Sequence, residues 1–275
     1  MVKVDVYLSQ SLIQDEMQLK DRNVIVIDVL RASSTILTAL VNQAKEIIPA
    51  ESVSVAARIS KGLGNSVLCG ERNGKIIEGF KLGNSPFEYT TDAVKGKTLI
   101  FSTTNGTISV TKSKFAKNCV VAGFLNLSAV VNYAASLNDD VTILCSGKLN
   151  DFCIEDSIAA GMIINGLMEI KGKANVELYD SGYMSYKLAK HLAYRNSKPD
   201  RGKLLSMLAD SEHGKYLASI GFGDDLKYCA ELDKLDKLPF YRNGVVKLKE
   251  TFEQEASEKS KMKRVNISSK PNSKD

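Results

Sequence analysis

The chain has 275 residues, of which 44% are hydrophobic and 25% charged, and its formal net charge is +5 at pH 7. This composition is typical of an ordinary globular protein, and the length suffices for one large domain or two modest ones with a sizeable core. There is no secretory apolar segment and no apolar run long enough to cross a membrane, so we expect a cytoplasmic protein without a membrane partner.

Residues 24–27 are four consecutive β-branched residues, which indicate a buried strand, and Asp28 follows directly. Ser33 and Ser34 are good N-caps for the apolar helix that comes next. A carboxylate at a strand end, beside a helix N-terminus and the guanidinium of Arg31, favours a metal and an anion bound together. Taken alone, the segment is equally compatible with a capped turn and a surface ion pair.

A segment rich in glycine and charge follows at residues 68–86. Glu71 and Arg72 come directly after a short apolar run, and Asn73-Gly74 has the chemistry of a tight hairpin turn. Asn84 lies in a second turn or helix start. An ordinary solvated hairpin is the simpler alternative, but the position after a strand favours a functional role for Glu71 and Arg72.

Two later strands end in the same way. The apolar run 98–101 leads into Thr104-Asn105-Gly106-Thr107, and the run 141–145 leads into Ser146-Gly147-Lys148. A helical pattern then begins near residue 153 and has Glu155-Asp156 in its first turn. Because open α/β sheets bind ligands outside the carboxyl ends of their strands, these strand ends predict one shared anion site.

The signals are weaker beyond residue 165. Residues 176–182 are typical of another strand end, and residues 183–194 of an amphipathic helix. Residues 210–225 indicate a pair of helices whose acids are solvated, and Asn243-Gly244 predicts a terminal hairpin. Residues 253–275 are charged and rich in Ser and Lys, and we expect them to form a disordered tail.

The alternation of strand and helix patterns predicts an α/β fold with a mixed or parallel sheet flanked by helices. We interpret the chain as two interlocked α/β halves. The first, residues 1–135, carries the segments of Asp28, Glu71 and Asn105, and the second, residues 136–252, carries Glu155-Asp156.

Together these motifs resemble the 2-phosphosulfolactate phosphatase family, a group of magnesium-dependent phosphatases of coenzyme M biosynthesis. The resemblance covers most of the chain and includes the order and spacing of the motifs. The matching segments are Asp28-Val29-Leu30-Arg31-Ala32-Ser33-Ser34-Thr35, Gly70-Glu71-Arg72, Gly79-Phe80, Leu82-Gly83-Asn84-Ser85-Pro86, Thr104-Asn105-Gly106-Thr107, Cys145-Ser146-Gly147 and Glu155-Asp156.

This resemblance implies Mg²⁺-assisted hydrolysis of a phosphate monoester of a small anionic hydroxy acid. The implied reaction converts (2R)-2-phospho-3-sulfolactate to 3-sulfolactate and inorganic phosphate. It also implies a homodimer. The positive net charge is compatible with such an anionic substrate.

Mg²⁺ prefers hard oxygen ligands, and Asp28 is the first candidate, with Glu71, Glu155 and Asp156 available to complete the coordination. Glu155 and Asp156 are adjacent and point about 100° apart on a helix, so one faces the site while the other caps or faces solvent. We slightly favour Asp156 for the inner position. Asp28, Glu71 and Asp156 are therefore the candidate catalytic residues.

Cationic side chains, hydroxyl groups and backbone amides at these strand ends could bind the three acidic groups of the substrate. Arg31, the serines and the turn after residue 103 suit the phosphate, because Gly106 lets the backbone approach an oxygen closely. Arg72 and Lys148 suit the sulfonate and the carboxylate. The candidate substrate-binding residues are Arg31, Ser33, Ser34, Arg72, Asn84, Thr104, Asn105, Gly106 and Lys148.

Two mechanisms are open, namely an aspartyl-phosphate on Asp28 and direct attack by an activated water. Haloacid-dehalogenase phosphatases use the first and carry a second Asp two positions after the nucleophile. That position is Leu30 in this chain, which favours attack by water.

Other nucleophiles compete weakly with this chemistry. His191 and His213 lie in no recognisable nucleophile motif, and we expect them to be structural or exposed. The cysteines form no Cys-x-x-Cys pair, which indicates reduced core thiols. They are Cys69, Cys119, Cys145, Cys153 and Cys229.

A non-catalytic or differently specific phosphate- or nucleotide-binding α/β protein is the main alternative. It is disfavoured because the chain has neither a P-loop motif nor a strand-linked Gly-x-Gly-x-x-Gly. A nucleic-acid partner is not expected, since the lysines are dispersed among acids and there is no Trp. Magnesium-dependent release of phosphate would distinguish the phosphatase from both alternatives.

Overall fold

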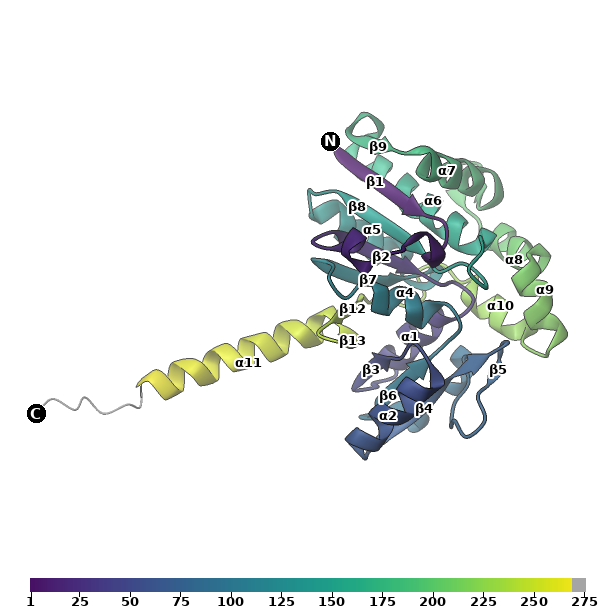
Figure 1. Cartoon of the computed structure of the whole chain (residues 1–275). Helices are drawn as coiled ribbons and strands as arrows, with labels where there is room; N and C mark the ends of the chain where they lie inside the picture. The colour runs from purple at the N-terminus through teal and green to yellow at the C-terminus, as the bar shows by residue number, and fades with distance from the viewer. Residues whose placement is uncertain (269–275) are drawn as a thin grey trace, which may run out of the picture.

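The computed structural model describes residues 1–268 and has one eleven-stranded mixed sheet running through the molecule (Figure 1). The strand order is β5-β4-β6-β3-β13-β12-β7-β2-β8-β1-β9. Six of the ten neighbouring pairs are parallel and four are antiparallel. The predicted α/β fold with a mixed sheet is confirmed.

Two parallel groups of strands are joined by an antiparallel hairpin. The first group contains β3 (Glu46–Pro49), β6 (Thr98–Ser102) and β4 (Ser66–Arg72), with the short β5 (Lys75–Ile76) antiparallel to β4. The second contains β7 (Asn118–Ala122), β2 (Asn23–Ile27), β8 (Val141–Cys145), β1 (Val2–Tyr7) and β9 (Val176–Leu178). The hairpin of β12 (Pro239–Arg242) and β13 (Val245–Leu248) contacts each group through one residue pair.

The central strands are buried on both faces. Every residue of β2, β6 and β8 is buried, which explains why these strands are almost continuously apolar instead of alternating. Two large hydrophobic clusters form the core, one on each side of the sheet. The strand ends, where the chain turns polar, are therefore held on a rigid scaffold.

Helices pack on both faces of the sheet. They are α1 (Ala32–Val41), α2 (Val53–Leu63), α3 (Thr91–Val94), α4 (Gly106–Lys112), α5 (Leu127–Ser136), α6 (Ile154–Lys171) and α7 (Asp180–Leu192). The longest of these, α6, packs between α5 and α7 and is buried from Glu155 to Asn165. Its first turn lies close to the end of β8.

Three further helices gather at one side of the sheet, drawn in green in Figure 1. They are α8 (Arg201–Asp210), α9 (Glu212–Ser219) and α10 (Gly223–Cys229), which contact one another and which we call the helical cap. A two-stranded ribbon of β10 (Tyr194–Arg195) and β11 (Lys198–Pro199) precedes them. The predicted helix pair in residues 210–225 corresponds to α9 and the start of α10.

Both predicted hairpins are confirmed. Asn73 and Gly74 join β4 to β5, and Asn243 and Gly244 join β12 to β13. All four residues have positive φ angles between 51° and 81°, the conformation that a two-residue type I′ turn requires. Asn and Gly are the residues that adopt this conformation at least cost.

The strands of the two predicted halves share one sheet. β1 and β2, from residues 1–135, lie on either side of β8, from residues 136–252. The hairpin β12–β13 in turn lies among strands of the first half. The division into halves at these boundaries stays a prediction.

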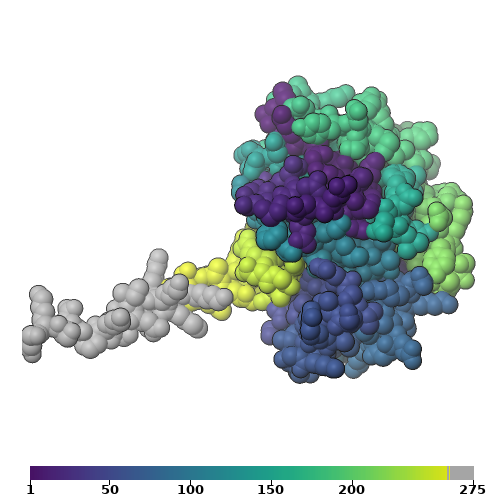
Figure 2. Space-filling view, in the orientation of Figure 1, coloured from purple at the N-terminus to yellow at the C-terminus, as the bar shows by residue number. Residues whose placement is uncertain are grey.

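The structure differs from the expected disordered tail over residues 253–268. Helix α11 (Lys249–Ser268) continues directly from β13 and projects away from the sheet, while residues 269–275 lie outside the described part (Figure 1). Figure 2 shows its first turns, in yellow, against the body of the protein. The ion pair of Lys249 with Glu253, four residues apart, supports these turns.

All five cysteines are buried and free, which confirms the predicted reduced core thiols. Among the described residues, no helix combines the length and the apolar character needed to cross a membrane.

Candidate functional site

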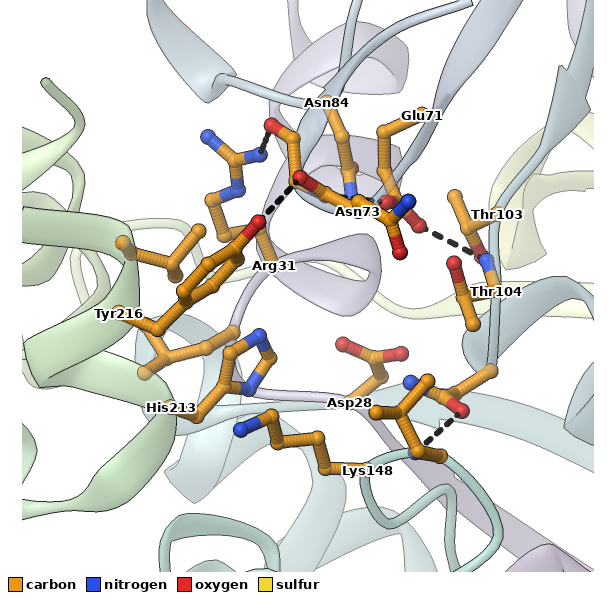
Figure 3. A pocket seen from close by; sticks show the side chains of 15 residues that line it. Asp28, Arg31, Glu71, Asn73, Asn84, Thr103, Thr104, Lys148, His213 and Tyr216 are labelled. Carbon is orange, nitrogen blue, oxygen red and sulfur yellow. Dashed lines mark hydrogen bonds between the residues drawn. The ribbon is translucent and has the colours of Figure 1, made fainter. Parts of the chain in front are cut away.

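A pocket of about 250 Å³ lies where the ends of four strands meet the helical cap (Figure 3). The segments after β2, β4, β6 and β8 all contribute to its wall, and α9 closes it from the other side. The lining residues are Asp28, Leu30, Arg31, Glu71, Asn73, Gly74, Asn84, Thr103, Thr104, Asn105, Lys148, Leu149, His213, Tyr216 and Leu217.

Asp28 is held at the end of β2 by local hydrogen bonds. Its Oδ1 accepts a hydrogen bond from the amide of Ala32 (3.0 Å), and its own amide donates to Ser33 Oγ (2.9 Å). No hydrogen bond to Oδ2 is found within residues 1–268. A Cβ on Gly106 would lie 2.5 Å from Oδ2, so α4 can begin this close to the carboxylate only with glycine. Oδ2 is therefore the oxygen of Asp28 that is available to a ligand in the pocket.

The environment of Asp28 opposes its charge. Burial raises the pKa of this carboxyl to about 6, and the nearby carboxylates of Glu71 and Glu155 act in the same direction. The hydrogen bond from the Ala32 amide and the proximity of His213 partly counteract this increase. A buried, ionised Asp28 is thus costly unless a cation accompanies it.

We predict that this cost appears in the pH dependence of stability of the metal-free protein. Because the folded-state pKa of Asp28 lies above the ordinary 3.8, the folded state binds more protons between these values. The contribution of Asp28 to the free energy of unfolding is fully present below about pH 4. As the pH rises through about 6, deprotonation of Asp28 lowers the free energy of unfolding by about 3 kcal/mol. Asp28→Asn should remove this loss.

Urea unfolding in EDTA at pH 4.5, 5.5 and 7 would measure this effect. The stability difference between Asp28→Asn and the wild type should increase with pH and then level off. A difference that is the same at all three pH values would contradict the assignment of a raised pKa.

Glu71 uses both carboxylate oxygens to join two loops. Oε2 accepts from the amide of Gly74 and Oε1 from the amide of Thr104, each at 2.8 Å. Glu71 lines the pocket, and each of its carboxylate oxygens accepts one backbone hydrogen bond (Figure 3). Its role as a metal ligand stays a prediction. In this geometry it fixes the β4–β5 turn against the loop after β6.

Arg72 does not reach the pocket. Its guanidinium turns back to donate to the backbone oxygen of Glu71 (2.6 Å) and to the carbonyl and hydroxyl oxygens of Ser102 (3.2 and 2.9 Å). The prediction that Arg72 binds the sulfonate or carboxylate has no support in this geometry. The arginine instead links the ends of β4 and β6.

Glu155 and Asp156 are both buried to 1% relative exposure, and neither lines the pocket directly. Asp156 accepts from the amides of Val29 (2.9 Å) and Gly147 (3.1 Å), so it joins the loops after β2 and β8. Burial, together with Asp28 and Glu155, holds the pKa of Asp156 well above its usual range. Each oxygen of Asp156 accepts one backbone hydrogen bond, and our choice of this residue for the inner position stays a prediction.

The neighbouring Glu155 has a different environment. Its Oε1 lies 3.0 Å from Nδ1 of His213, which lines the pocket. Its Oε2 is buried and has no hydrogen-bond partner among the described residues. Glu155 therefore has an unsatisfied oxygen immediately behind the pocket wall.

Two cations line the pocket, and they are held very differently. Arg31 is almost completely buried, donates from Nη2 to the carbonyl oxygen of Gly74 (2.7 Å), and forms an ion pair with Asp225. Lys148 pairs with Glu212 (2.6 Å), whose side chain is 90% exposed. Because water screens exposed ion pairs, Lys148 is the cation that can exchange its partner for a ligand.

The predicted serines serve the backbone and not the pocket. Ser33 Oγ accepts from Asp28, and Ser34 Oγ donates to the carbonyl oxygen of Val29 (3.1 Å). Neither serine lines the pocket. Both hydroxyls hold the turn between β2 and α1 in shape.

Of the other predicted binding residues, Asn84, Thr104 and Asn105 line the pocket, while Gly106 lies against Asp28. Oδ1 of Asn84 is buried without a hydrogen-bond partner in the described part of the chain. Asn105 Oδ1 accepts from the amide of Leu149 (3.1 Å). These side chains supply neutral polar groups around Asp28.

Sequence reasoning missed the contribution of the helical cap. We expected His213 to be structural or exposed, but it lines the pocket and contacts Glu155. Tyr216 lies one turn further along α9 and donates to the carbonyl oxygen of Asn73 (2.9 Å). The presence of only two histidines in the chain was the one sequence signal that could have identified His213.

The donor set fits a lightly coordinated Mg²⁺ better than a cage of four carboxylates. Within residues 1–268, no three His, Cys, Asp or Glu side chains converge as a metal-binding group. Among the four acids considered as ligands, Asp28 Oδ2 and Glu155 Oε2 are the oxygens that accept no hydrogen bond from residues 1–268. Mg²⁺ at phosphoryl-transfer sites often takes one or two carboxylates plus waters and substrate oxygens, so the free oxygens match this pattern.

Fold and pocket together define an α/β protein with a small-anion site at the carboxyl ends of its strands. The family model described as 2-phosphosulpholactate phosphatase matches residues 7–244. The chain belongs to this family, as its motifs suggested.

Curated relatives agree over most of their length. A protein of Caldanaerobacter subterraneus subsp. tengcongensis is 38% identical over 86% of this chain and 95% of its own. A protein of Carboxydothermus hydrogenoformans is 40% identical over 80% of this chain and 86% of its own. One from Clostridium acetobutylicum is 37% identical over 89% of this chain and 100% of its own. Each is named probable 2-phosphosulfolactate phosphatase.

Proposed function

We propose that this protein is a Mg²⁺-dependent phosphatase that hydrolyses (2R)-2-phospho-3-sulfolactate to 3-sulfolactate and inorganic phosphate. Family membership and the names of the relatives support the reaction. The structural observation that carries the proposal is one pocket containing a buried carboxylate with a free oxygen, a fixed guanidinium and an exchangeable lysine. These groups are Asp28, Arg31 and Lys148.

The phosphate would bind near Arg31, whose remaining N–H groups can donate to its nonbridging oxygens. Thr103 and Thr104 supply further polar groups on the opposite wall (Figure 3), and Asn105, the next residue of this loop, also lines the pocket. Lys148 would leave the exposed Glu212 to pair with the sulfonate or carboxylate. The substrate would thus lie across the pocket with its phosphate near Asp28.

We propose Asp28 Oδ2 and Glu155 Oε2 as the protein ligands of Mg²⁺. When bound, the ion would neutralise phosphate charge and lower the pKa of a bound water. The number of acidic side chains around the pocket also favours a bound cation. Asp28, Glu71, Glu155 and Asp156 lie at or behind the pocket, and Asp225 cancels the charge of Arg31.

In the favoured mechanism, a water oxygen forms a new bond to phosphorus as the ester P–O bond breaks. One water proton passes to a carboxylate of the pocket, and the leaving oxygen gains a proton from His213. Asp28 Oδ2 would orient the water by accepting a hydrogen bond from it. Nδ1 of His213 contacts Glu155, so the doubly protonated imidazole would donate its Nε2 proton to the leaving oxygen and end as the neutral ring.

An aspartyl-phosphate on Asp28 is the alternative mechanism. Stopping the reaction with acid during turnover and measuring the mass of the peptide that contains Asp28 would distinguish the two. We expect an unmodified peptide, and one bearing a phosphoryl group would establish the covalent route.

Phosphate release from 2-phosphosulfolactate and from plain phosphomonoesters, with Mg²⁺ and with EDTA, tests the proposed function. We expect release only with Mg²⁺ and fastest from the sulfonated substrate. No release from any substrate would overturn the proposal and favour a non-catalytic or differently specific phosphate- or nucleotide-binding protein.

Lys148→Ala should weaken recognition of the second acidic group. A charge-assisted hydrogen bond contributes about 1.5–3 kcal/mol, so KM for 2-phosphosulfolactate should rise by about 10- to 100-fold. KM for a phosphomonoester without sulfonate or carboxylate should change far less. Lys215→Ala, at an exposed position on α9, is the matched control. An equal loss with both substrates would contradict this role.

The remaining implications of the family are also proposals. They are a place in coenzyme M biosynthesis, a cytoplasmic location, a homodimeric state and the absence of nucleic-acid and membrane partners. Light scattering coupled to gel filtration would test the dimer, and a monomeric mass at micromolar concentration would contradict it.

A further inference from the structure

The guanidinium of Arg31 is held by a residue 194 positions away in the sequence. Asp225, in the first turn of α10, accepts a hydrogen bond from Nη1 through Oδ2 at 2.5 Å. Both side chains are at most 3% exposed. A charge pair this deeply buried persists only when its geometry and its other hydrogen bonds are favourable.

The second oxygen of Asp225 reaches another wall of the pocket. Oδ1 accepts from the hydroxyl of Ser85 at 2.7 Å, and Ser85 directly follows the pocket residue Asn84. The backbone oxygen of Asn84 in turn accepts from Thr35 in α1. Asp225 therefore ties the segment after β2 to the segment containing Asn84.

Two further contacts restrict the guanidinium. Nη2 donates to the carbonyl oxygen of Gly74. Phe222, which precedes α10, packs its ring against the guanidinium, with 4.2 Å between the ring centroid and Cζ of Arg31. Asp225 and Gly74 each take one of the five N–H groups of Arg31, which lines the pocket, and the other three make no hydrogen bond within residues 1–268. Since Asp225 also cancels the positive charge, Arg31 must act through the direction of its hydrogen bonds.

We propose that Asp225 is a positioning residue that orients Arg31 for the substrate phosphate and thereby makes the helical cap part of the site. This inference rests on the proposed function. It assigns a role to an acid that the sequence alone placed among solvated helix residues.

The test compares Asp225→Ala with Asp224→Ala, because Asp224 lies in the same turn but is 78% exposed. We expect Asp225→Ala to lower kcat/KM about 100-fold and Asp224→Ala to change it less than twofold. Asp225→Asn can still accept from Arg31 and donate to Ser85, so it should lose less than 10-fold. Melting temperatures confirm that each variant is folded.

A double-mutant cycle with Arg31→Lys separates positioning from general support of the fold. If Asp225 acts through the fork of Arg31, Asp225→Ala should add less than threefold to the loss caused by Arg31→Lys. Losses that multiply, or an Asp225→Ala variant as active as the wild type, would overturn the proposal. If Asp225→Ala does not fold, Ser85→Ala replaces it in the test. We expect Ser85→Ala to raise KM about 3- to 10-fold, and an unchanged KM would overturn the proposal.

Binding of inorganic phosphate distinguishes failure of this inference from failure of the proposed function. A wild type that releases no phosphate from any ester would refute the phosphatase. Calorimetric titration with phosphate would still test the positioning role, with Kd expected to rise at least 10-fold in Asp225→Ala and to stay unchanged in Asp224→Ala.

Discussion

Asp28→Asn is expected to lower kcat by at least about 1,000-fold while the fold is retained. The asparagine keeps a carbonyl oxygen that can accept from the amide of Ala32, so the turn after β2 needs no rearrangement. It removes the charge at the one oxygen of this side chain that faces the pocket without a hydrogen bond. That oxygen is our proposed contact to both Mg²⁺ and the attacking water.

Steady-state kinetics and thermal unfolding measure the two parts of this prediction. Asp210→Asn, at an exposed position at the end of α8, is the control for loss of one carboxylate and should remain fully active. Added Mg²⁺ should raise the melting temperature of the wild type but not that of Asp28→Asn. Turnover within tenfold of the wild type would refute the role of Asp28.

Asp156→Ala is expected to cause a large loss of stability. It leaves the buried amides of Val29 and Gly147 without acceptors, at about 1–3 kcal/mol each. For a chain of this size the melting temperature should fall by roughly 10 °C. Asp156→Asn should also destabilise, since its amide group would face a backbone N–H.

Glu155→Gln, at the adjacent position, should behave in the opposite way. Both side chains are equally buried, but Glu155 has a free oxygen and contacts His213. We expect a near-wild-type melting temperature and about a 100-fold lower kcat. Thermal unfolding and kinetics of the two variants side by side would check this contrast. An Asp156→Ala variant as stable as the wild type would contradict it.

Local sequence patterns were sufficient to predict the fold class and the position of the site. The β-branched run before Asp28 and the polar segments after the other strands follow from rules that operate over a few residues. The hairpins at Asn73-Gly74 and Asn243-Gly244 follow from the same kind of rule. Because parallel strands bring their ends together, the location of the pocket followed without knowledge of the strand order.

The tasks of individual side chains could not be predicted, because they depend on which backbone donors lie nearby. Glu71 and Asp156 were chosen as acids for chemistry, yet each uses both oxygens to join two loops. Arg72 and Ser33 were chosen as ligand donors, yet both are engaged within the scaffold. The sequence shows which polar groups are present, but it does not show which of them are hydrogen-bonded to the backbone in the folded protein.

The helical cap was beyond sequence reasoning for a different reason. His213, Tyr216 and Asp225 meet residues that lie 58 to 194 positions earlier in the chain. No periodicity reports a contact at such separation. Their segment has the polar composition of a solvated helix pair, and only the packing of α9 and α10 against the pocket reveals their use.

A crystal structure of the wild type with Mg²⁺ and inorganic phosphate would test the central claim most directly. We predict phosphate within hydrogen-bond distance of Arg31 and a metal ion bound to Oδ2 of Asp28, in the pocket where β2, β4, β6 and β8 end. Phosphate bound elsewhere, or a metal ion that does not contact Asp28, would contradict the account.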